Sequence, residues 1–104
     1  MRVIICGAGQ VGVNLARYLS ERDNHVTVID SSAELINKLN DRLDVKAIHG
    51  FASHPDVLES AGGASADMLI AVTYSDEVNM IACEIAHALF KIPTKISRIR
   101  NQTY

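Results

Sequence analysis

The sequence predicts a single α/β domain in which helices cover both faces of a doubly wound parallel sheet. Short apolar runs alternate along the chain with segments whose apolar residues recur at helical spacing, and this alternation is typical of βαβ units. The strand-like runs are also apolar throughout, as expected for strands that are buried on both faces. A length of 104 residues supports one domain, which we take as residues 1–104.

The first part of the chain contains two strands and the helix between them. Val3–Cys6 is an apolar run that ends at a glycine, so it predicts a buried first strand. Behind it, Val11, Leu15 and Leu19 recur every four residues, as they would on one face of a helix. The β-branched run His25–Ile29 predicts the second strand.

The middle of the chain predicts two further helices around a third strand. Ser31 and Glu34 match a capping box, so the second helix is expected to begin at Ser31. Val45–His49 follows as the third strand. Pro55 then opens a short helix, which is expected to end at Gly62-Gly63.

The last third of the chain predicts a fourth strand, a long helix and a fifth strand. Met68–Val72 is the strand, and Ser75 begins the helix, whose buried face is expected to carry Met80, Ile81, Ile85, Ala88 and Leu89. Pro93 blocks continuation of the helix, so Thr94–Ile99 forms the fifth strand. Doubly wound sheets usually have a sixth strand, and the chain is therefore expected to be a fragment of a longer protein.

Composition excludes several classes of protein. The formal net charge of −2 argues against binding to nucleic acid or to an anionic membrane surface. No apolar run approaches the length of a membrane span, so direct membrane insertion is not expected. The two cysteines form no disulfide framework, which favours a reducing, cytoplasmic location. His49 and His54 match no zinc-ligand spacing, so no metal site is expected.

The strongest motif is G-x-G-x-x-G, formed here by Gly7, Ala8, Gly9, Gln10, Val11 and Gly12. It follows a predicted strand and opens a predicted helix, which is the context that gives the motif meaning. Gly7 makes the tight turn, Gly9 lets a pyrophosphate approach the backbone, and Gly12 lets the helix pack close to the strand. The phosphates would bind the free N–H groups at the helix N-terminus. The motif therefore predicts a Rossmann-type nucleotide-binding domain.

Asp30, at the end of the second strand, is the expected ribose-binding acid. It lies 18 residues after Gly12, close to the usual spacing of about 20. A carboxylate there accepts hydrogen bonds from both ribose hydroxyls and repels a 2′-phosphate. Ser31 follows, with no arginine nearby, so NAD(H) or a mononucleotide is favoured over NADP(H). The alternative is a glycine turn and an N-capping aspartate that bind no ligand.

Two further loops are expected to complete the crevice. Gly50, Phe51 and Ala52 follow the third strand, where adenine lies in this topology. Phe51 either covers the adenine or is a core phenylalanine below the loop. Val72 and Thr73 follow the fourth strand and should form the floor on the other side. No nucleophile or general base can be identified, so no catalytic residue is expected.

Several stretches resemble the N-terminal domain of the RCK (regulator of K⁺ conductance) family: Val3–Gly12, Ile29-Asp30, Ala71–Met80 and Ser97–Asn101. The resemblance covers essentially the whole chain. It implies a regulatory subunit without enzymatic activity, which binds NAD(H) and also ATP, ADP or AMP at the same site. Such a subunit would form homo-oligomers in the cytoplasm and act on a membrane potassium transporter at the inner face of the membrane.

The resemblance also assigns roles to individual residues. The family's glycine-loop and ribose-acid roles fall on Gly7, Gly9, Gly12 and Asp30, whereas Arg98 matches a basic position that reaches phosphates or a neighbouring subunit. Phe51 stands where the family often has Asp or Asn, so a polar contact to adenine is not expected there.

Two other functions fit the same motif. The chain could be the cofactor domain of an NAD-dependent dehydrogenase, or a small NAD-binding interaction module unrelated to transport, because a fold does not fix a function. Under the regulatory interpretation, the helix Ser75–Leu89 is expected to mediate self-association, with Ala82 and Ala86 allowing close approach of a second helix.

Overall fold

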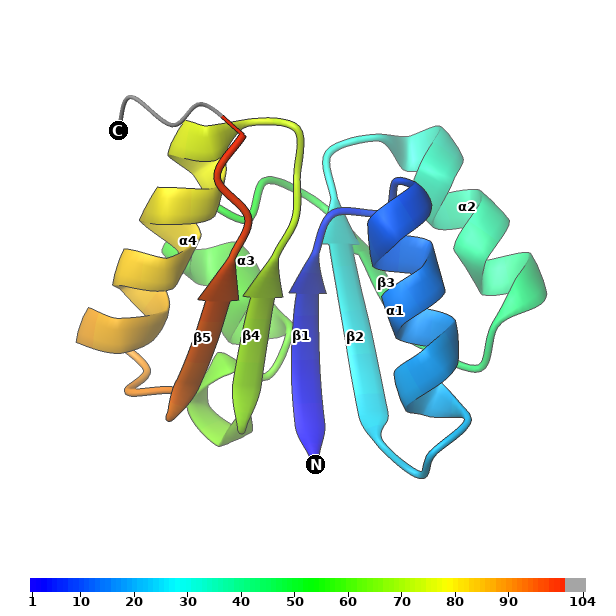
Figure 1. The fold of residues 1–104 in the computed structure, drawn as a ribbon, viewed down its shortest axis with the longest axis horizontal. Helices are drawn as coiled ribbons and strands as arrows, with labels where there is room; N and C mark the ends of the chain where they lie inside the picture. The colour runs from blue at the N-terminus through cyan, green and yellow to red at the C-terminus, as the bar shows by residue number, and fades with distance from the viewer. Residues whose placement is uncertain (101–104) are drawn as a thin grey trace.

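The computed structural model describes residues 1–100, so Asn101, the last residue of the RCK-like stretches, lies outside the described residues. Over the described range the expected α/β fold is confirmed (Figure 1). In chain order the elements are β1 (Arg2–Cys6), α1 (Gln10–Ser20), β2 (His25–Asp30), α2 (Ala33–Arg42), β3 (Lys46–His49), α3 (Pro55–Ser60), the 3-10 turn η1 (Gly63–Ser65), β4 (Met68–Ala71), α4 (Asp76–Ala88) and β5 (Thr94–Ser97).

All five strands are parallel and lie in the order β3-β2-β1-β4-β5. Because β1 pairs with both β2 and β4, the chain winds outward from β1 in one direction and then in the other. The carboxyl ends of the strands point upward in Figure 1, and the loops to α1, α2, α3 and α4 all leave from this edge. In open sheets of this kind, ligands bind outside the carboxyl ends where the winding reverses, which here is beside β1.

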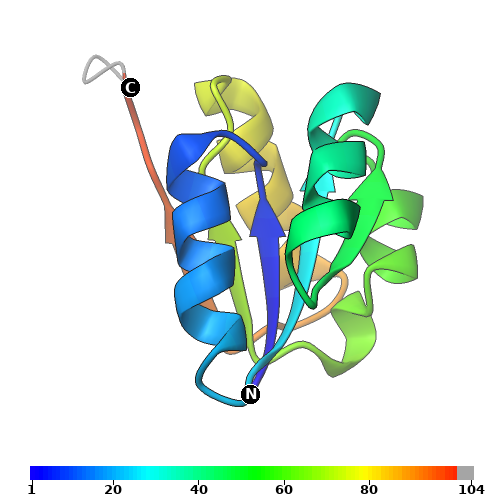
Figure 2. The same cartoon turned by 90° about the vertical axis from the view of Figure 1, so that its right-hand side faces the viewer.

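The helices cover both faces of the sheet. In Figure 2, which looks from the right-hand side of Figure 1, α1 and α2 lie in front of the strands and α4 lies behind them. Alternate side chains of β1 point into the two cores: Val3 and Ile5 pack with α1 and α2, whereas Ile4 and Cys6 pack with α3 and α4. The strands are therefore buried on both faces, which explains why their sequences are apolar throughout.

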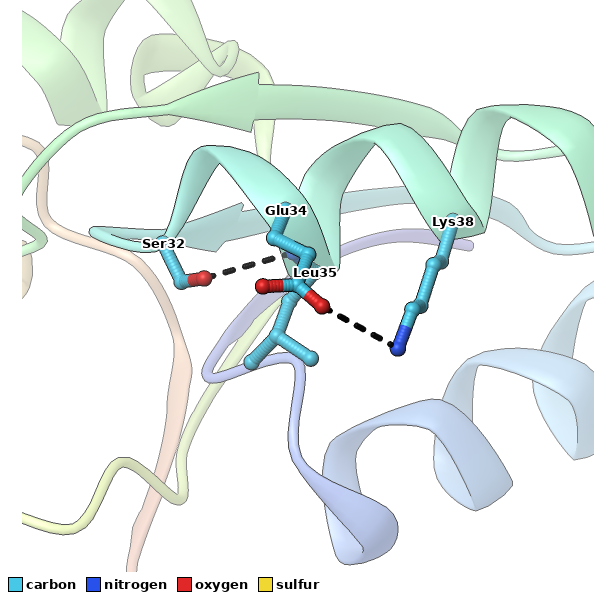
Figure 3. Close-up of polar contacts among 4 residues, drawn as sticks. All are labelled: Ser32, Glu34, Leu35 and Lys38. Atoms are coloured by element: carbon cyan, nitrogen blue, oxygen red, sulfur yellow. Dashed lines mark hydrogen bonds and ion pairs between the residues drawn. The ribbon is translucent and has the colours of Figure 1, made fainter.

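The N-terminus of α2 differs from the expected capping box by one residue. Ser32, not Ser31, is the N-cap, and its hydroxyl accepts a hydrogen bond at 3.3 Å from the backbone N–H three residues later (Figure 3). Glu34 forms an ion pair with Lys38 at 3.5 Å in place of a bond back to the cap (Figure 3). The shift arises because the Asp30 carboxylate accepts the Ser32 amide at 2.7 Å and completes a turn before the helix begins.

The buried face of α4 is not the one that the apolar residues predicted. Four residues expected on that face are exposed, namely Met80, Ile81, Ala88 and Leu89. The buried residues of α4 are small or polar: Asp76, Asn79, Ala82 and Ala86. The prediction that the two alanines face a second subunit is therefore wrong, because both are fully buried in the core beneath α4. Their small size lets α4 lie close to the sheet.

Candidate functional site

The loop between β1 and α1 contains the glycine motif, and the fold itself requires two of its three glycines. Gly7 has a φ of +119°, in the left-handed region, and a Cβ there would lie 2.8 Å from the carbonyl oxygen of Val72. A Cβ on Gly12 would collide with the carbonyl oxygen of Gly7. The first substitution would push the glycine loop away from the segment after β4, and the second would push α1 away from the glycine loop. Both glycines therefore have a structural role that is independent of any ligand.

Gly9 has no comparable structural role. Its φ of −76° is accessible to every residue type. The three atoms nearest to a Cβ at Gly9 would all belong to the Tyr74 side chain, the closest being the hydroxyl oxygen at 3.4 Å. Tyr74 is 72% exposed, so its side chain has room to move. The backbone of Gly9 therefore borders space that the core of the domain does not use.

Helix α1 begins directly after this same glycine, and no side chain caps its N-terminus. Gly9 is the N-cap residue and offers no side-chain acceptor, and the first turn contains no acidic residue. The amide of Val13 is bonded to the Gly9 carbonyl oxygen at 2.9 Å. The amides of residues 10–12 come before the first such bond and face outward along the helix axis. Together with the helix dipole they form a favourable site for an anion.

Asp30 lies at the carboxyl end of β2, beside the glycine loop. One carboxylate oxygen accepts the Ala8 amide at 2.7 Å and the other accepts the Ser32 amide, also at 2.7 Å. The side chain therefore fixes the glycine loop and the start of α2 relative to each other. Each oxygen of an ionised carboxylate has a second lone pair, so the group can still accept hydrogen bonds from the two hydroxyls of a ribose.

A cavity of about 340 Å³ lies beyond the carboxyl ends of β2 and β3, between the start of α2 and the start of α4. The residues predicted to bind the nucleoside line it together: Asp30, Ser31, Gly50, Phe51, Ala52 and Thr73. The core alternative for Phe51 is wrong, because its side chain is 53% exposed and its ring centroid lies 5.6 Å from that of His54 at the rim. Leu35 and Val78, which the sequence analysis did not assign, supply further apolar surface. An open cavity with apolar walls and a carboxylate at one end suits an adenosine.

A second, smaller cavity of about 70 Å³ lies against the glycine loop. Its lining includes eight of the residues predicted to bind a nucleotide: Gly7, Gly9, Gln10, Val11, Asp30, Val72, Thr73 and Arg98. Of the predicted site residues, Ala8 and Gly12 line neither this cavity nor the one of about 340 Å³.

Arg98 brings positive charge to the smaller cavity. Its Nη2 donates to the carbonyl oxygens of Val72 and Thr73, at 3.0 and 3.1 Å. The buried Nε of Arg98 has no hydrogen-bond partner among the described residues. The guanidinium is therefore held at the rim by backbone carbonyls and not by an acidic side chain.

Asn79 on α4 holds the crevice floor in place, a role that the sequence analysis did not predict. It is fully buried, and its Oδ1 accepts hydrogen bonds from the Thr73 amide at 2.9 Å and the Thr73 hydroxyl at 2.7 Å. Its Nδ2 donates to the Arg98 carbonyl oxygen at 3.1 Å. The signal in the sequence is its spacing, because Asn79 stands three and seven residues before Ala82 and Ala86 and so shares their face of the helix.

A larger hollow, of about 830 Å³, lies at the opposite edge of the sheet. It is lined by residues at the amino ends of the strands, among them Arg2, His25 and Lys46. Ligands of open α/β sheets bind outside the carboxyl ends. The two cavities near β1 are therefore the better candidate site despite their smaller size.

Reactive groups at the site are few. Cys6 immediately precedes the glycine loop. It is fully buried, and burial raises the pKa of its thiol well above the usual value. A thiol that stays protonated is a poor nucleophile and a poor metal ligand. Among residues 1–100, no three His, Cys, Asp or Glu side chains lie close enough to hold a metal ion. Within the same range, no helix has the length and apolar character needed to cross a membrane.

The reversal of winding beside β1 and the glycine loop at that point define a Rossmann-type α/β domain. The sequence model of the TrkA-N domain family matches residues 3–104. The chain belongs to this family.

Relatives that share much of the sequence include two Trk system potassium uptake proteins TrkA. The one from Azorhizobium caulinodans is 55% identical over the whole chain, and the one from Halomonas elongata is 53% identical. The chain spans 23% of the length of each of these proteins. Among solved structures, the Shewanella denitrificans Kef CTD in AMP-bound form is 26% identical and superposes with a TM-score of 0.83, covering 99% of this chain and 62% of that one.

Proposed function

We propose that the chain is the nucleotide-sensing domain of a regulatory subunit of a potassium uptake transporter. In this proposal the crevice beside β1 binds NAD(H) or an adenine mononucleotide such as AMP, ADP or ATP. The observation that carries it is the combination of Gly9 and the uncapped N-terminus of α1. Gly9 has a backbone conformation open to any residue, yet its lack of a side chain leaves free the space where a phosphate would meet the helix amides.

The position of each part of the nucleotide follows from the two cavities. The adenine would lie in the larger cavity against Phe51, and the ribose hydroxyls would donate to the Asp30 carboxylate. The phosphates would lie over Gly9, with Arg98 at the far rim. The likeness to the Kef CTD supports the binding of an adenine nucleotide, because that protein is described in its AMP-bound form.

The regulatory part of the proposal rests on the relatives. Two proteins that are 55% and 53% identical to this chain over its whole length are named as potassium uptake proteins, which favours a transport regulator over the dehydrogenase alternative. Partners and location follow from the same likeness: a membrane potassium transporter, with the domain at its cytoplasmic face.

The ribose assignment can be tested by calorimetric titration of the purified chain with AMP, NADH and NADPH. A 2′-phosphate beside the Asp30 carboxylate meets like charge and removes a hydrogen bond to a charged acceptor, so NADPH should bind at least about tenfold more weakly than NADH. Asp30→Asn should narrow this gap. Asp41→Asn, at an exposed aspartate on α2, should leave the gap unchanged. Equal affinities for NADH and NADPH in the native chain would exclude the ribose assignment.

Self-association through α4 is part of the same proposal. The outer face of α4 presents Met80 and Ile81, which are 42% and 46% exposed, and contiguous exposed apolar residues commonly mark an interface. Ile81→Glu should shift a dimer toward monomer in light scattering coupled to size exclusion. Tyr18→Glu, on the other face of the sheet, should have no such effect. A native chain that stays monomeric at tens of micromolar would refute this part.

A further inference from the structure

Three residues line both cavities. Asp30 and Thr73 are already assigned to the nucleotide, and Tyr74 is the third. It lies in the loop between β4 and α4, across the crevice from the glycine loop. We propose that Tyr74 is a specificity-determining residue: its phenol covers the phosphate side of the site and makes the domain favour compact adenine nucleotides over dinucleotides. This inference rests on the proposed nucleotide site and addresses which ligand that site prefers.

The position of the phenol over Gly9 is the first observation. Three atoms of Tyr74, the hydroxyl oxygen, Cε2 and Cζ, lie 3.4 to 3.7 Å from the point where a Cβ of Gly9 would be. A phosphate oxygen bound to the amides after Gly9 would be about 2.9 Å from a backbone nitrogen, with the rest of the phosphate beyond it. In this proposal the first phosphate takes this place, whereas the second phosphate of a dinucleotide has to continue past Gly9 and competes with the phenol for the same space.

The two cavities differ in size for this reason. The adenosine side is open at about 340 Å³, whereas the space between the glycine loop, Tyr74 and Arg98 is reduced to about 70 Å³. A nucleotide with a single phosphate has to place only that phosphate in the smaller cavity. A dinucleotide has to continue through the smaller one, and it can do so only after the phenol has moved.

Two guanidinium groups hold the phenol in this position. The central carbon of Arg100 lies 5.0 Å from the centroid of the Tyr74 ring, and that of Arg98 lies 6.0 Å away. Both distances fall within the range of cation–π attraction. Moving the ring weakens these contacts, and the loss opposes the binding of any ligand long enough to require the movement.

The test compares NADH with AMP by calorimetric titration of the native chain and of Tyr74→Ala. Removing the phenol should raise the affinity for NADH about fivefold, the size expected for one or two exposed cation–π contacts, while the affinity for AMP changes less than about twofold. Tyr74→Phe keeps the ring and should resemble the native chain. Because Tyr74 is 72% exposed, its replacement should not disturb folding, which urea denaturation can verify.

Tyr18→Ala is the matched control. Tyr18 is also an exposed tyrosine, with an arginine guanidinium 3.6 Å from its ring centroid, but it lies on α1 away from the site. Its removal should alter neither affinity. In addition, the ring resonances of Tyr74, assigned in the spectrum by comparison with Tyr74→Phe, should shift on addition of NADH.

The outcomes separate this inference from the proposed function. If the native chain binds AMP and NADH but Tyr74→Ala leaves their affinity ratio unchanged, Tyr74 does not set the preference, although the nucleotide site stands. If Tyr74→Ala weakens NADH more than AMP, the phenol contacts the dinucleotide and the inference is wrong. If the native chain binds neither ligand, the proposed function itself fails, and the inference fails with it.

Discussion

The N-terminus of α4 is closed by its own side chains, whereas the N-terminus of α1, at the same edge of the sheet, has no such closure. At α4, the Ser75 hydroxyl accepts the Val78 amide at 3.2 Å, and two acidic residues occupy the first turn. The start of α2 is closed in the same manner by Ser32, with Glu34 in its first turn. At α1, the cap is a glycine and the first turn has no acid.

This difference separates what the fold requires from what a ligand requires. A hydroxyl or carboxylate at the N-cap stabilises a helix by a few tenths of a kcal/mol relative to glycine, and an acid in the first turn adds about 0.3–1 kcal/mol. The start of α1 lacks both contributions, although α1 follows β1, the central strand of the sheet. An anion bound there would supply the missing acceptor and the missing negative charge, which is why we place the phosphates at this helix.

The first test separates the glycines inside the loop by their effect on stability. Gly12→Ala should destabilise the chain by about 1–3 kcal/mol or more, because the new Cβ collides with the Gly7 carbonyl oxygen. Gly9→Ala should cost less than about 1 kcal/mol, the effect of alanine at an N-cap. Urea denaturation of both variants gives the two values. Equal destabilisation would show that Gly9 is also needed by the fold.

The second test asks whether Gly9 is needed for binding. Gly9→Val places a branched side chain where a phosphate would meet the helix amides, so affinity for AMP and NADH should fall at least about a hundredfold, the loss of two hydrogen bonds to a charged group. The circular dichroism spectrum should stay native. Normal nucleotide binding by this variant would exclude the glycine loop as the phosphate site.

The third and smallest effect comes from making α1 resemble α4. Gly9→Ser adds a hydroxyl that can cap the helix, so the unliganded chain should gain a few tenths of a kcal/mol while its affinity for AMP decreases. The reciprocal variant Ser75→Gly should lose a similar amount of stability and retain AMP binding. Denaturation and titration of the same two proteins give both results. An increase in AMP affinity for Gly9→Ser would contradict the role assigned to the open N-terminus.

The sequence was sufficient for the order of the elements, because strands buried on both faces are apolar throughout and the glycine motif stands between a strand and a helix. It was also sufficient to bring Asp30 and the glycine loop to the same edge. It misplaced the buried face of α4, because apolar residues occur on more than one side of that helix and the small residues Ala82 and Ala86 are the buried ones.

Two features of the site depend on contacts between distant segments and could not be predicted locally. The N-cap of α2 is Ser32 and not Ser31 because Asp30 accepts a hydrogen bond from the Ser32 amide. Both candidates are serines, so residue type alone could not distinguish them. Tyr74 gains its place over Gly9 only when the loops after β1 and β4 are adjacent. Nothing in its own neighbourhood of the sequence indicates that contact.

We claim that the open N-terminus of α1 binds the phosphate of an adenine nucleotide. Titration with AMP, followed at the backbone amides themselves, tests this claim. In ¹H–¹⁵N spectra, we expect saturable shifts that are largest at residues 7–12, with smaller ones at Asp30, Ser32 and Phe51. The capped start of α4 should shift less than that of α1. Shifts confined to the opposite edge of the sheet, or no saturable shift at millimolar AMP, would contradict the claim.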